Sequence, residues 1–314
     1  MIRILAPAPL LLALLAPTPQ VDREVLAMGT RLRIQLSGPA AALAGEGLVA
    51  EVARIEAACS TWEPTSSWSR LNGAGGRPVR LDAEWLGLLG ECQRWARRTE
   101  GAFDPVLMAL LKVWGTREGG RNPGPRELLE AREASGVGLL YLDAEMGTAR
   151  LRVAGAGVEE GAFLKGYALD AGRRRARALG VATGCLDFGG QLLAWGDPAP
   201  VSIADPANRT RPRVSLQLRD ESLSTSGCSE RGRHILDPRS GQPCEAWGSV
   251  SVLAPSALEA DILSTALYVL GPAAGAAWAE REGVAALFLH LDGRVGMSSR
   301  FRSHRPTLTN GDPL

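Results

Sequence analysis

The feature that most constrains the fold is the way short segments of alternating polarity are interleaved with longer segments of helical spacing. Residues 30–36 alternate apolar and polar side chains, which is typical of a strand with one buried face. Residues 40–59 instead place Leu48, Val52 and Ile55 at the spacing of one helix face. The chain then returns to strands and helices several times, so the pattern predicts an α+β fold with mainly antiparallel sheets and packed helices.

The other expected elements follow from the same two periodicities and from turn residues. Gly101 is suited to end the second helix, and Asp292–Gly293 is a hairpin turn signal. The further helices are expected over 83–99, 161–179 and 255–270. The further strands are expected over 139–143, 149–153, 184–188, 200–204, 214–219, 233–236, 249–253 and 284–291.

Composition sets the class of protein. The 314 residues are 45% hydrophobic and 22% charged, so the chain can bury a full core. Because no Pro- or Ser-rich linker divides its middle, we expect one two-lobed body: a single domain over 21–304 with a polar tail over 305–314. A net charge of +1 gives the protein no positive field that would attract a nucleic-acid backbone, so nucleic-acid partners are not expected.

The first 20 residues differ in character from the rest. Arg3 precedes an apolar run over 10–15, which is far shorter than the roughly 20 residues that a membrane span needs. We therefore expect 1–20 to be a signal peptide or N-terminal anchor. The protein would then be exported, to the periplasm or to the outer face of the inner membrane. No Cys follows the run, so a lipoprotein is not expected.

The cysteines give little support for a metal centre. The chain has five, and none forms a C-x-x-C pair, which argues against a zinc site. Cys228 and Cys244 flank one expected loop. Two interpretations stay open for them: a disulfide formed after export, or two separate buried thiols.

A carboxylate and a hydroxyl share one face of the helix expected over 255–270. Ser256 and Glu259 form a capping-box pattern that fixes the start of this helix. Asp261 and Thr265 then lie four residues apart, so their oxygens can be offered to one hard cation such as Mg²⁺. Taken alone, the pair also fits the exposed stripe of an ordinary amphipathic helix.

Three turn-rich segments carry other candidate groups. His234, at the end of an expected strand and beside Asp237, can act as a general base near neutral pH or simply close a turn. In 101–105, Asp104 follows a helix end and can cap the next helix. In 159–167, small residues at a helix start allow a ligand to approach the backbone, and Lys165 lies where it can meet a phosphate or face solvent.

In their order along the chain, these segments resemble the ApbE family, the FAD:protein FMN transferases. The resemblance runs from Met28 to about Gly271. Each motif is weak alone, but the ordered set is specific. The motifs lie at 28–30, 60–72, 101–105, 165–170, 189–190, 224–227, 234–241 and 259–266. The family fold that this implies is the ApbE-like, T-fold-related α+β body.

The resemblance also implies roles for individual residues. Asp261, the Thr265 hydroxyl and the main-chain oxygen of Ala162 would bind Mg²⁺, while His234 would be the base for the acceptor hydroxyl with Asp237 beside it. The residues implied to line the FAD site are Met28, Trp62, Ala102, Phe103, Asp104, Glu159, Lys165 and His234. Three positions depart from the common pattern: Trp62 replaces Tyr, Glu159 replaces Asp, and Gln191 follows the glycine pair.

The implied reaction uses FAD as substrate. The hydroxyl of a Thr or Ser in an exported or membrane-bound redox protein would attack the FMN phosphorus, with Mg²⁺ offsetting charge on the pyrophosphate and AMP leaving. Two alternatives stay open. One is an Mg²⁺-dependent FAD pyrophosphatase that uses water and releases FMN and AMP, and the other is a flavin-binding protein without catalysis.

Overall fold

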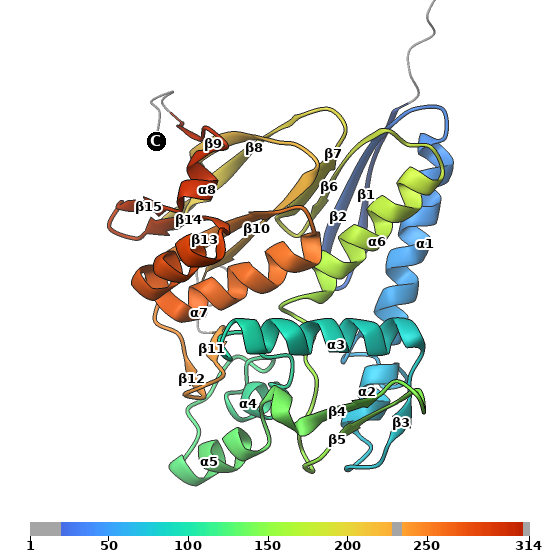
Figure 1. Ribbon diagram of the computed structural model, residues 1–314, viewed down its shortest axis with the longest axis vertical. Helices are drawn as coiled ribbons and strands as arrows, with labels where there is room; N and C mark the ends of the chain where they lie inside the picture. The colour runs from blue at the N-terminus through green and yellow to red at the C-terminus, as the bar shows by residue number, and fades with distance from the viewer. Residues whose placement is uncertain (1–19, 228–233, 310–314) are drawn as a thin grey trace, which may run out of the picture.

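The computed structural model describes residues 20–227 and 234–309, which form two lobes (Figure 1). The upper lobe in this view contains a large sheet, and the lower lobe holds shorter helices and a small sheet. Helix α3 (Ala83–Arg98) runs between them. The two-lobed α+β architecture expected from the sequence is confirmed. The leader expected over 1–20 lies outside the described residues except for Gln20, and so does Cys228.

The large sheet has eight strands in the order β1-β2-β6-β7-β10-β13-β14-β15, and neighbouring strands run antiparallel. The first four along the chain are β1 (Gln20–Ala27), β2 (Thr30–Ser37), β6 (Thr183–Phe188) and β7 (Gln191–Trp195). The others are β10 (Glu221–Gly227), β13 (Gly248–Ala254), β14 (Ala285–His290) and β15 (Val295–Met297).

Three long helices cover one face of this sheet. They are α1 (Ala41–Cys59), α6 (Leu164–Ala178) and α7 (Ala257–Glu282). Among the described helices, α7 alone is long and apolar enough to cross a membrane by length and composition, but 56% of its apolar window is buried inside the protein. It is also interrupted at Gly271, whose φ of 78° is non-helical, just before Pro272. We therefore describe α7 as a core helix.

The opposite face of the sheet is covered by a second apolar cluster. It forms around a three-stranded sheet of β8 (Ala199–Asp205), β9 (Asn208–Leu218) and β16 (Thr307–Leu308), together with α8 (Ser299–Arg302). All seven residues of β13 are buried because both faces of the central strands are covered.

The lower lobe comprises the segments between α1 and α6. Its helices besides α3 are α2 (Ser67–Asn72), α4 (Met108–Val113), α5 (Pro125–Glu133) and the short 3₁₀ helix η1 (Val137–Leu139). Its sheet is formed by β3 (Val79–Arg80), β5 (Thr148–Leu151) and β4 (Leu140–Asp143). A two-stranded hairpin, β11 (Leu236–Asp237) and β12 (Gln242–Pro243), extends below α7 in Figure 1.

The structure differs from the sequence expectations in several places. Residues 224–227, interpreted as a turn-rich group, belong to the central strand β10, because each of them pairs with a residue of β13. The strand expected over 233–236 is reduced, within the described residues, to the two-residue β11. Helix α6 begins at Leu164 rather than 161. Part of the polar tail expected over 305–314 pairs with β9 as β16, and 310–314 lie outside the described residues.

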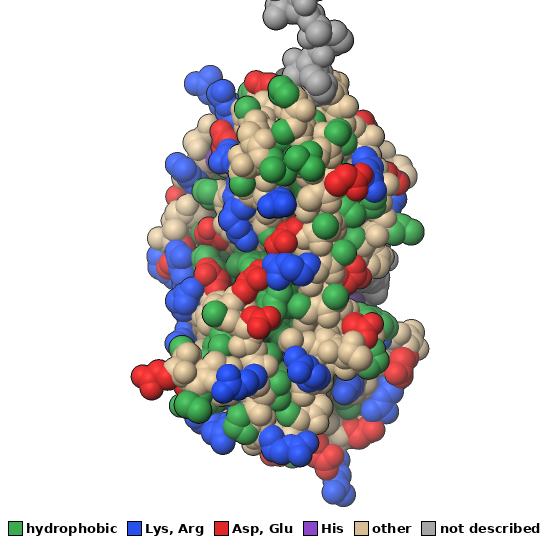
Figure 2. All heavy atoms as spheres, turned by 90° about the vertical axis from the view of Figure 1, so that its right-hand side faces the viewer, with side chains coloured by type: hydrophobic (Ala, Val, Ile, Leu, Met, Phe, Trp, Pro, Cys, Tyr) green, Lys and Arg blue, Asp and Glu red, His purple; other side chains and the backbone are tan. Residues whose placement is uncertain are grey.

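Acidic and basic side chains are interspersed on the face of the molecule seen from the right of Figure 1. Figure 2 shows Lys, Arg, Asp and Glu side chains alternating over this face, with apolar side chains between them. This mixed surface is in line with the net charge of +1.

Candidate functional site

The centre of the candidate site is a close approach between the first turns of α6 and α7. A Cβ on Gly166 would lie 2.3 Å from the main-chain oxygen of Ala257 and 2.8 Å from the Cα of Leu258, so only glycine fits there. The approach allows the Gly166 N–H to donate to Asp261 Oδ2 over 3.1 Å. The carboxylate of Asp261 thereby caps the first turn of α6, where the helix dipole favours a negative charge.

Asp261 is a buried carboxylate, with 5% of its surface exposed. Burial raises its pKa, and the Lys165 ammonium, the Gly166 N–H and the Ser224 hydroxyl oppose this effect. Lys165 Nζ lies 3.8 Å from Asp261 Oδ2 and 3.4 Å from the main-chain oxygen of Gly161. Lys165 therefore links the carboxylate to the turn at 161–163 that precedes α6.

A chain of hydrogen-bonded hydroxyls from β10 and α7 lies next to Asp261. Ser264 Oγ donates to the main-chain oxygen of Asp261 over 3.0 Å and lies 3.2 Å from Ser224 Oγ. Ser226 Oγ lies 2.9 Å from Ser264 Oγ and 3.4 Å from Thr265 Oγ1. Because alternate residues of a strand face one side, Ser224 and Ser226 both meet α7. The side chain of Thr265 is thus positioned by hydrogen bonding next to the turn of α7 that holds Asp261.

The residues present fit a hard divalent cation. The described part of the chain contains no cluster of three or more His, Cys, Asp and Glu side chains that could hold a metal ion. The expected set instead combines the Asp261 carboxylate, the Thr265 hydroxyl and the Ala162 main-chain oxygen, which are the kinds of oxygen ligand that Mg²⁺ takes. A cation would also compensate the cost of burying the Asp261 charge.

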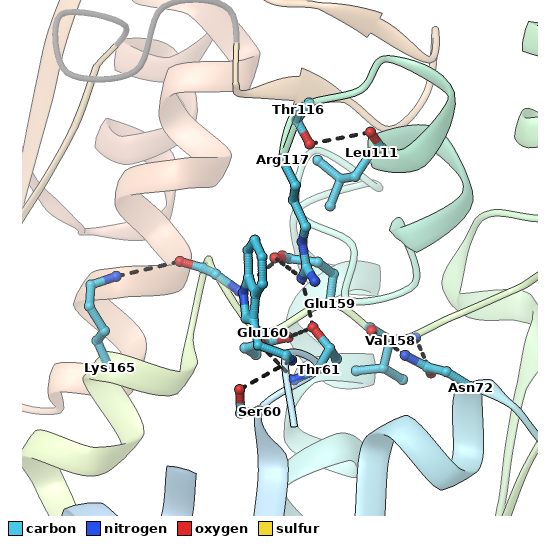
Figure 3. Close-up of polar contacts among 12 residues, drawn as sticks. Ser60, Thr61, Asn72, Leu111, Thr116, Arg117, Val158, Glu159, Glu160 and Lys165 are labelled. Atoms are coloured by element: carbon cyan, nitrogen blue, oxygen red, sulfur yellow. Dashed lines mark hydrogen bonds and ion pairs between the residues drawn. The ribbon is translucent and has the colours of Figure 1, made fainter. Parts of the chain in front are cut away.

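A second polar cluster lies where the 60–66 loop meets the 158–161 segment (Figure 3). Glu160 is buried and accepts two hydrogen bonds from Thr61, one from the main-chain N–H at 2.9 Å and one from the hydroxyl at 2.7 Å. Arg117 Nη2 donates to Thr61 Oγ1 over 2.6 Å and to Glu159 Oε1 over 3.4 Å. Its guanidinium carbon lies 4.2 Å from the centre of the Trp62 ring.

Glu159 folds back onto the turn that follows it. Its Oε2 accepts the N–H of Gly161 over 2.9 Å, and burial together with the neighbouring Glu160 charge raises its pKa. The preceding residue, Val158, exchanges two main-chain hydrogen bonds with the Asn72 side chain, at 2.8 Å and 2.9 Å. The Glu159 carboxylate therefore helps to hold the turn that carries Ala162.

The segment containing Ala102, Phe103 and Asp104 is built into the core of the lower lobe. Ala102 and Phe103 are 1% exposed, and Phe103 packs edge-on against Phe163. Only main-chain atoms of these two residues are therefore suited to face a ligand. Asp104 accepts the N–H groups of Val106 at 2.8 Å and Val137 at 2.7 Å, so it closes a turn and does not cap α4.

Asp104 should make stability depend on pH. Burial raises its pKa from 3.8 to about 6. Because the folded protein binds this proton more tightly than the unfolded chain, the contribution of Asp104 to stability falls as pH rises through this window. We expect the wild type to lose about 1 kcal/mol relative to Asp104→Asn between pH 5 and pH 7.5. Denaturant unfolding of both proteins at the two pH values measures this, and a constant difference would contradict it.

Met28 lies at the tip of the β1–β2 hairpin. Met28 and Gly29 both have positive φ, 46° and 70°, as a two-residue hairpin turn requires. The N–H of Met28 donates to Glu56 Oε1 over 2.9 Å, which fixes the tip against α1. The glycine pair Gly189 and Gly190 forms the equivalent turn between β6 and β7, beside Thr30.

Gln191 and Asp170 fix the start of α7. The Gln191 side chain donates to the main-chain oxygen of Ala257 over 2.7 Å. Asp170 Oδ2 accepts the Ser256 hydroxyl at 2.7 Å and the N–H of Leu258 at 3.0 Å. Ser256 in turn accepts the N–H of Glu259, which confirms the Ser half of the expected capping box. These contacts hold the helix end that presents Asp261.

His234 is half-buried and precedes the β11–β12 hairpin. The adjacent main-chain oxygen of Ile235 accepts the N–H of Cys244 over 2.8 Å. Asp237 is held by Arg239 through both carboxylate oxygens, at 2.9 Å and 3.0 Å. The Asp237 charge is thus balanced by Arg239. The expected role of His234 as the base, with Asp237 beside it, stays a prediction.

Three residues of the site were not expected from the sequence: Thr61, Arg117 and Glu160. The adjacent pair of acidic residues at 159–160 was a usable signal, since two neighbouring carboxylates need partners. The sequence around Arg117 carries no such signal, because Arg117 lies in a Gly-rich segment and its partners are 42 and 56 residues away.

Solved structures share this fold and arrangement of elements. The crystal structure of the flavinyl transferase ApbE of Pseudomonas stutzeri superposes with a TM-score of 0.84 at 29% identity, covering 92% of this chain and 98% of that one. The ApbE protein of Thermotoga maritima gives 0.85 at 26% identity, covering 91% of this chain and 99% of that one. The fold and site thus define an ApbE-type flavin transferase architecture.

Sequence comparisons agree with this class. The model of the ApbE family matches residues 28–288. An FAD:protein FMN transferase of Treponema pallidum is 31% identical over 315 residues, covering 89% of this chain and 87% of the relative. The chain belongs to the ApbE family.

Proposed function

We propose that this enzyme transfers FMN from FAD onto a Thr or Ser hydroxyl of an acceptor protein, with Mg²⁺ as the cofactor and AMP as the second product. Membership of the ApbE family supports flavin transfer itself. The observation that carries the metal part of the proposal is the buried Asp261 carboxylate, held between the first turn of α6 and the Lys165 ammonium.

The surroundings of Asp261 suit a pyrophosphate. Lys165 supplies a positive charge, and the start of α6 presents a helix N-terminus, which favours anions. Mg²⁺ held by Asp261, Thr265 and the Ala162 main-chain oxygen would offset charge that develops on the pyrophosphate oxygens.

The remaining groups divide the work of binding and proton transfer. The exposed ring of Trp62 offers a surface on which a flavin or adenine ring can stack. His234 takes the proton from the acceptor hydroxyl as its oxygen forms a bond to the FMN phosphorus. The bond between that phosphorus and the bridging oxygen breaks, and AMP leaves with the electron pair.

We also propose where the acceptor is found. The signal-peptide pattern at 1–20 supports export to the periplasm or to the outer face of the inner membrane. The acceptor would then be an exported or membrane-bound redox protein that carries the modified Thr or Ser.

The experiment incubates the purified protein with FAD, MgCl₂ and a flavin-accepting domain of an exported redox protein. Intact mass of the acceptor is measured alongside free FMN and AMP. We expect an acceptor heavier by one FMN, with one AMP released for each transfer. EDTA should stop the reaction, and added Mg²⁺ should restore it.

The other outcomes distinguish the alternatives. Free FMN and AMP with an unmodified acceptor would identify a hydrolase, in which water replaces the protein hydroxyl. Tight FAD binding with intact FAD would identify a binding protein. Transfer that persists in EDTA after removal of bound metal would contradict the Mg²⁺ requirement.

A further inference from the structure

We propose that Arg117 is a positioning residue for FAD, which fixes the stacking face of Trp62 and the turn at 161–163 as one unit. The proposal rests on the proposed function, because it concerns how the same nucleotide is held. Arg117 lies outside the sequence motifs that identify the site, in the segment between α4 and α5.

Arg117 fixes the orientation of Trp62. Its guanidinium covers one face of the indole at 4.2 Å and donates to the hydroxyl of Thr61, the preceding residue, over 2.6 Å. Glu160 holds Thr61 from the other side through two hydrogen bonds. The Trp62 side chain is nevertheless 68% exposed, so its other face is open to a planar ring. A large apolar ring held this firmly and still exposed is suited to a ligand.

The same guanidinium is also linked to the residues around Asp261, where the proposed Mg²⁺ site lies. Arg117 Nη2 pairs with Glu159 Oε1 at 3.4 Å, and Glu159 Oε2 accepts the N–H of Gly161. The main-chain oxygen of Gly161 accepts Lys165 Nζ, which faces Asp261 at 3.8 Å. A continuous chain of contacts therefore runs from the ring of Trp62 to the carboxylate of Asp261, and Figure 3 shows Arg117, Glu159 and Lys165 along it.

The chemistry requires such a link. FAD is long, and transfer needs both its ring and its pyrophosphate in fixed positions relative to the incoming hydroxyl. Arginine suits the role, since its planar fork can stack on an indole while donating to two oxygens, whereas lysine keeps only the charge. Loss of Arg117 would leave Glu159 as a half-buried carboxylate with its charge partner removed.

The test measures FAD binding without turnover. Flavin fluorescence is titrated with the protein in EDTA and without acceptor, for the wild type, Arg117→Ala, Arg117→Met, Arg117→Lys and Arg121→Ala. Arg121 is the matched control: it lies in the same segment, but its partner is the exposed Glu127. We expect the Kd for FAD to rise about 10-fold in R117A and R117M, less in R117K, and to stay within about 2-fold in R121A.

A second readout separates positioning from a general structural role. R117A combined with Trp62→Ala should lose less FAD affinity than the sum of the two single losses, because part of the effect of Arg117 acts through Trp62. In transfer assays, KM for FAD and the Mg²⁺ concentration for half-maximal rate should both rise, while kcat at saturation changes less.

The proposal is overturned if R117A and R117M bind FAD like the wild type, or if their effects simply add to that of W62A. If R117A fails to fold, R117M carries the test, since its stem still packs on Trp62. The binding titration involves neither Mg²⁺ nor an acceptor. Its result therefore does not depend on whether the proposed transfer reaction occurs.

Discussion

Replacing Asp261 by asparagine should abolish flavin transfer while the protein stays folded. The amide oxygen can still accept the Gly166 N–H, so the cap on α6 is retained. The negative charge needed to hold a divalent cation is lost, and we expect the rate of acceptor modification to fall about 100-fold or more. Because burial raises the pKa of Asp261, the charge opposes folding at neutral pH, so its removal should leave the melting temperature unchanged or higher.

Glu259→Gln provides the matched control for this variant. Glu259 lies two residues earlier on the same helix, and burial raises its pKa too. The same charge is therefore removed from the same helix, but away from the face shared by Asp261 and Thr265. E259Q should keep its Mg²⁺-dependent transfer. Equal loss of transfer in both variants would show that charge on α7, rather than a ligand at Asp261, governs activity.

The periodic parts of this fold could be predicted from the sequence. Helix α1 and strand β2 appear within a residue of their expected bounds, because each has one buried and one exposed face. Strand β10 could not be predicted. The Ser-Thr-Ser-Gly composition of residues 224–227 is that of a turn, and these residues form a strand only because β13 pairs with them.

Some contacts of the site could likewise be predicted from the sequence, and others could not. The pairing of Asp261 with Thr265 follows from helical spacing, and the approach of Lys165 to Asp261 confirms that the two motif segments meet. The contacts of Arg117 follow from the tertiary fold, which brings Thr61, Arg117 and Glu159 together from three separate segments. No local sequence pattern encodes such a contact, because it depends on the tertiary fold.

Gly166→Ala should cost both stability and activity. The added Cβ would lie 2.3 Å from the main-chain oxygen of Ala257, and main-chain atoms at a helix start cannot move aside as a side chain can. The first turns of α6 and α7 must therefore separate, which carries the Gly166 N–H away from Asp261. Overpacking of this kind costs about 1–3 kcal/mol, more than the gain of about 1 kcal/mol in helix propensity.

Gly172→Ala tests whether the main-chain contact is the cause. Gly172 lies on the same helix, and the atoms nearest to its added Cβ belong to the side chain of Leu48, with Cγ at 2.9 Å. Since a leucine side chain can rotate, G172A should retain most transfer activity and lose less stability than G166A. Thermal unfolding and acceptor mass measure both effects. If G166A matched G172A in both, the close approach of the two helices would not be what positions Asp261.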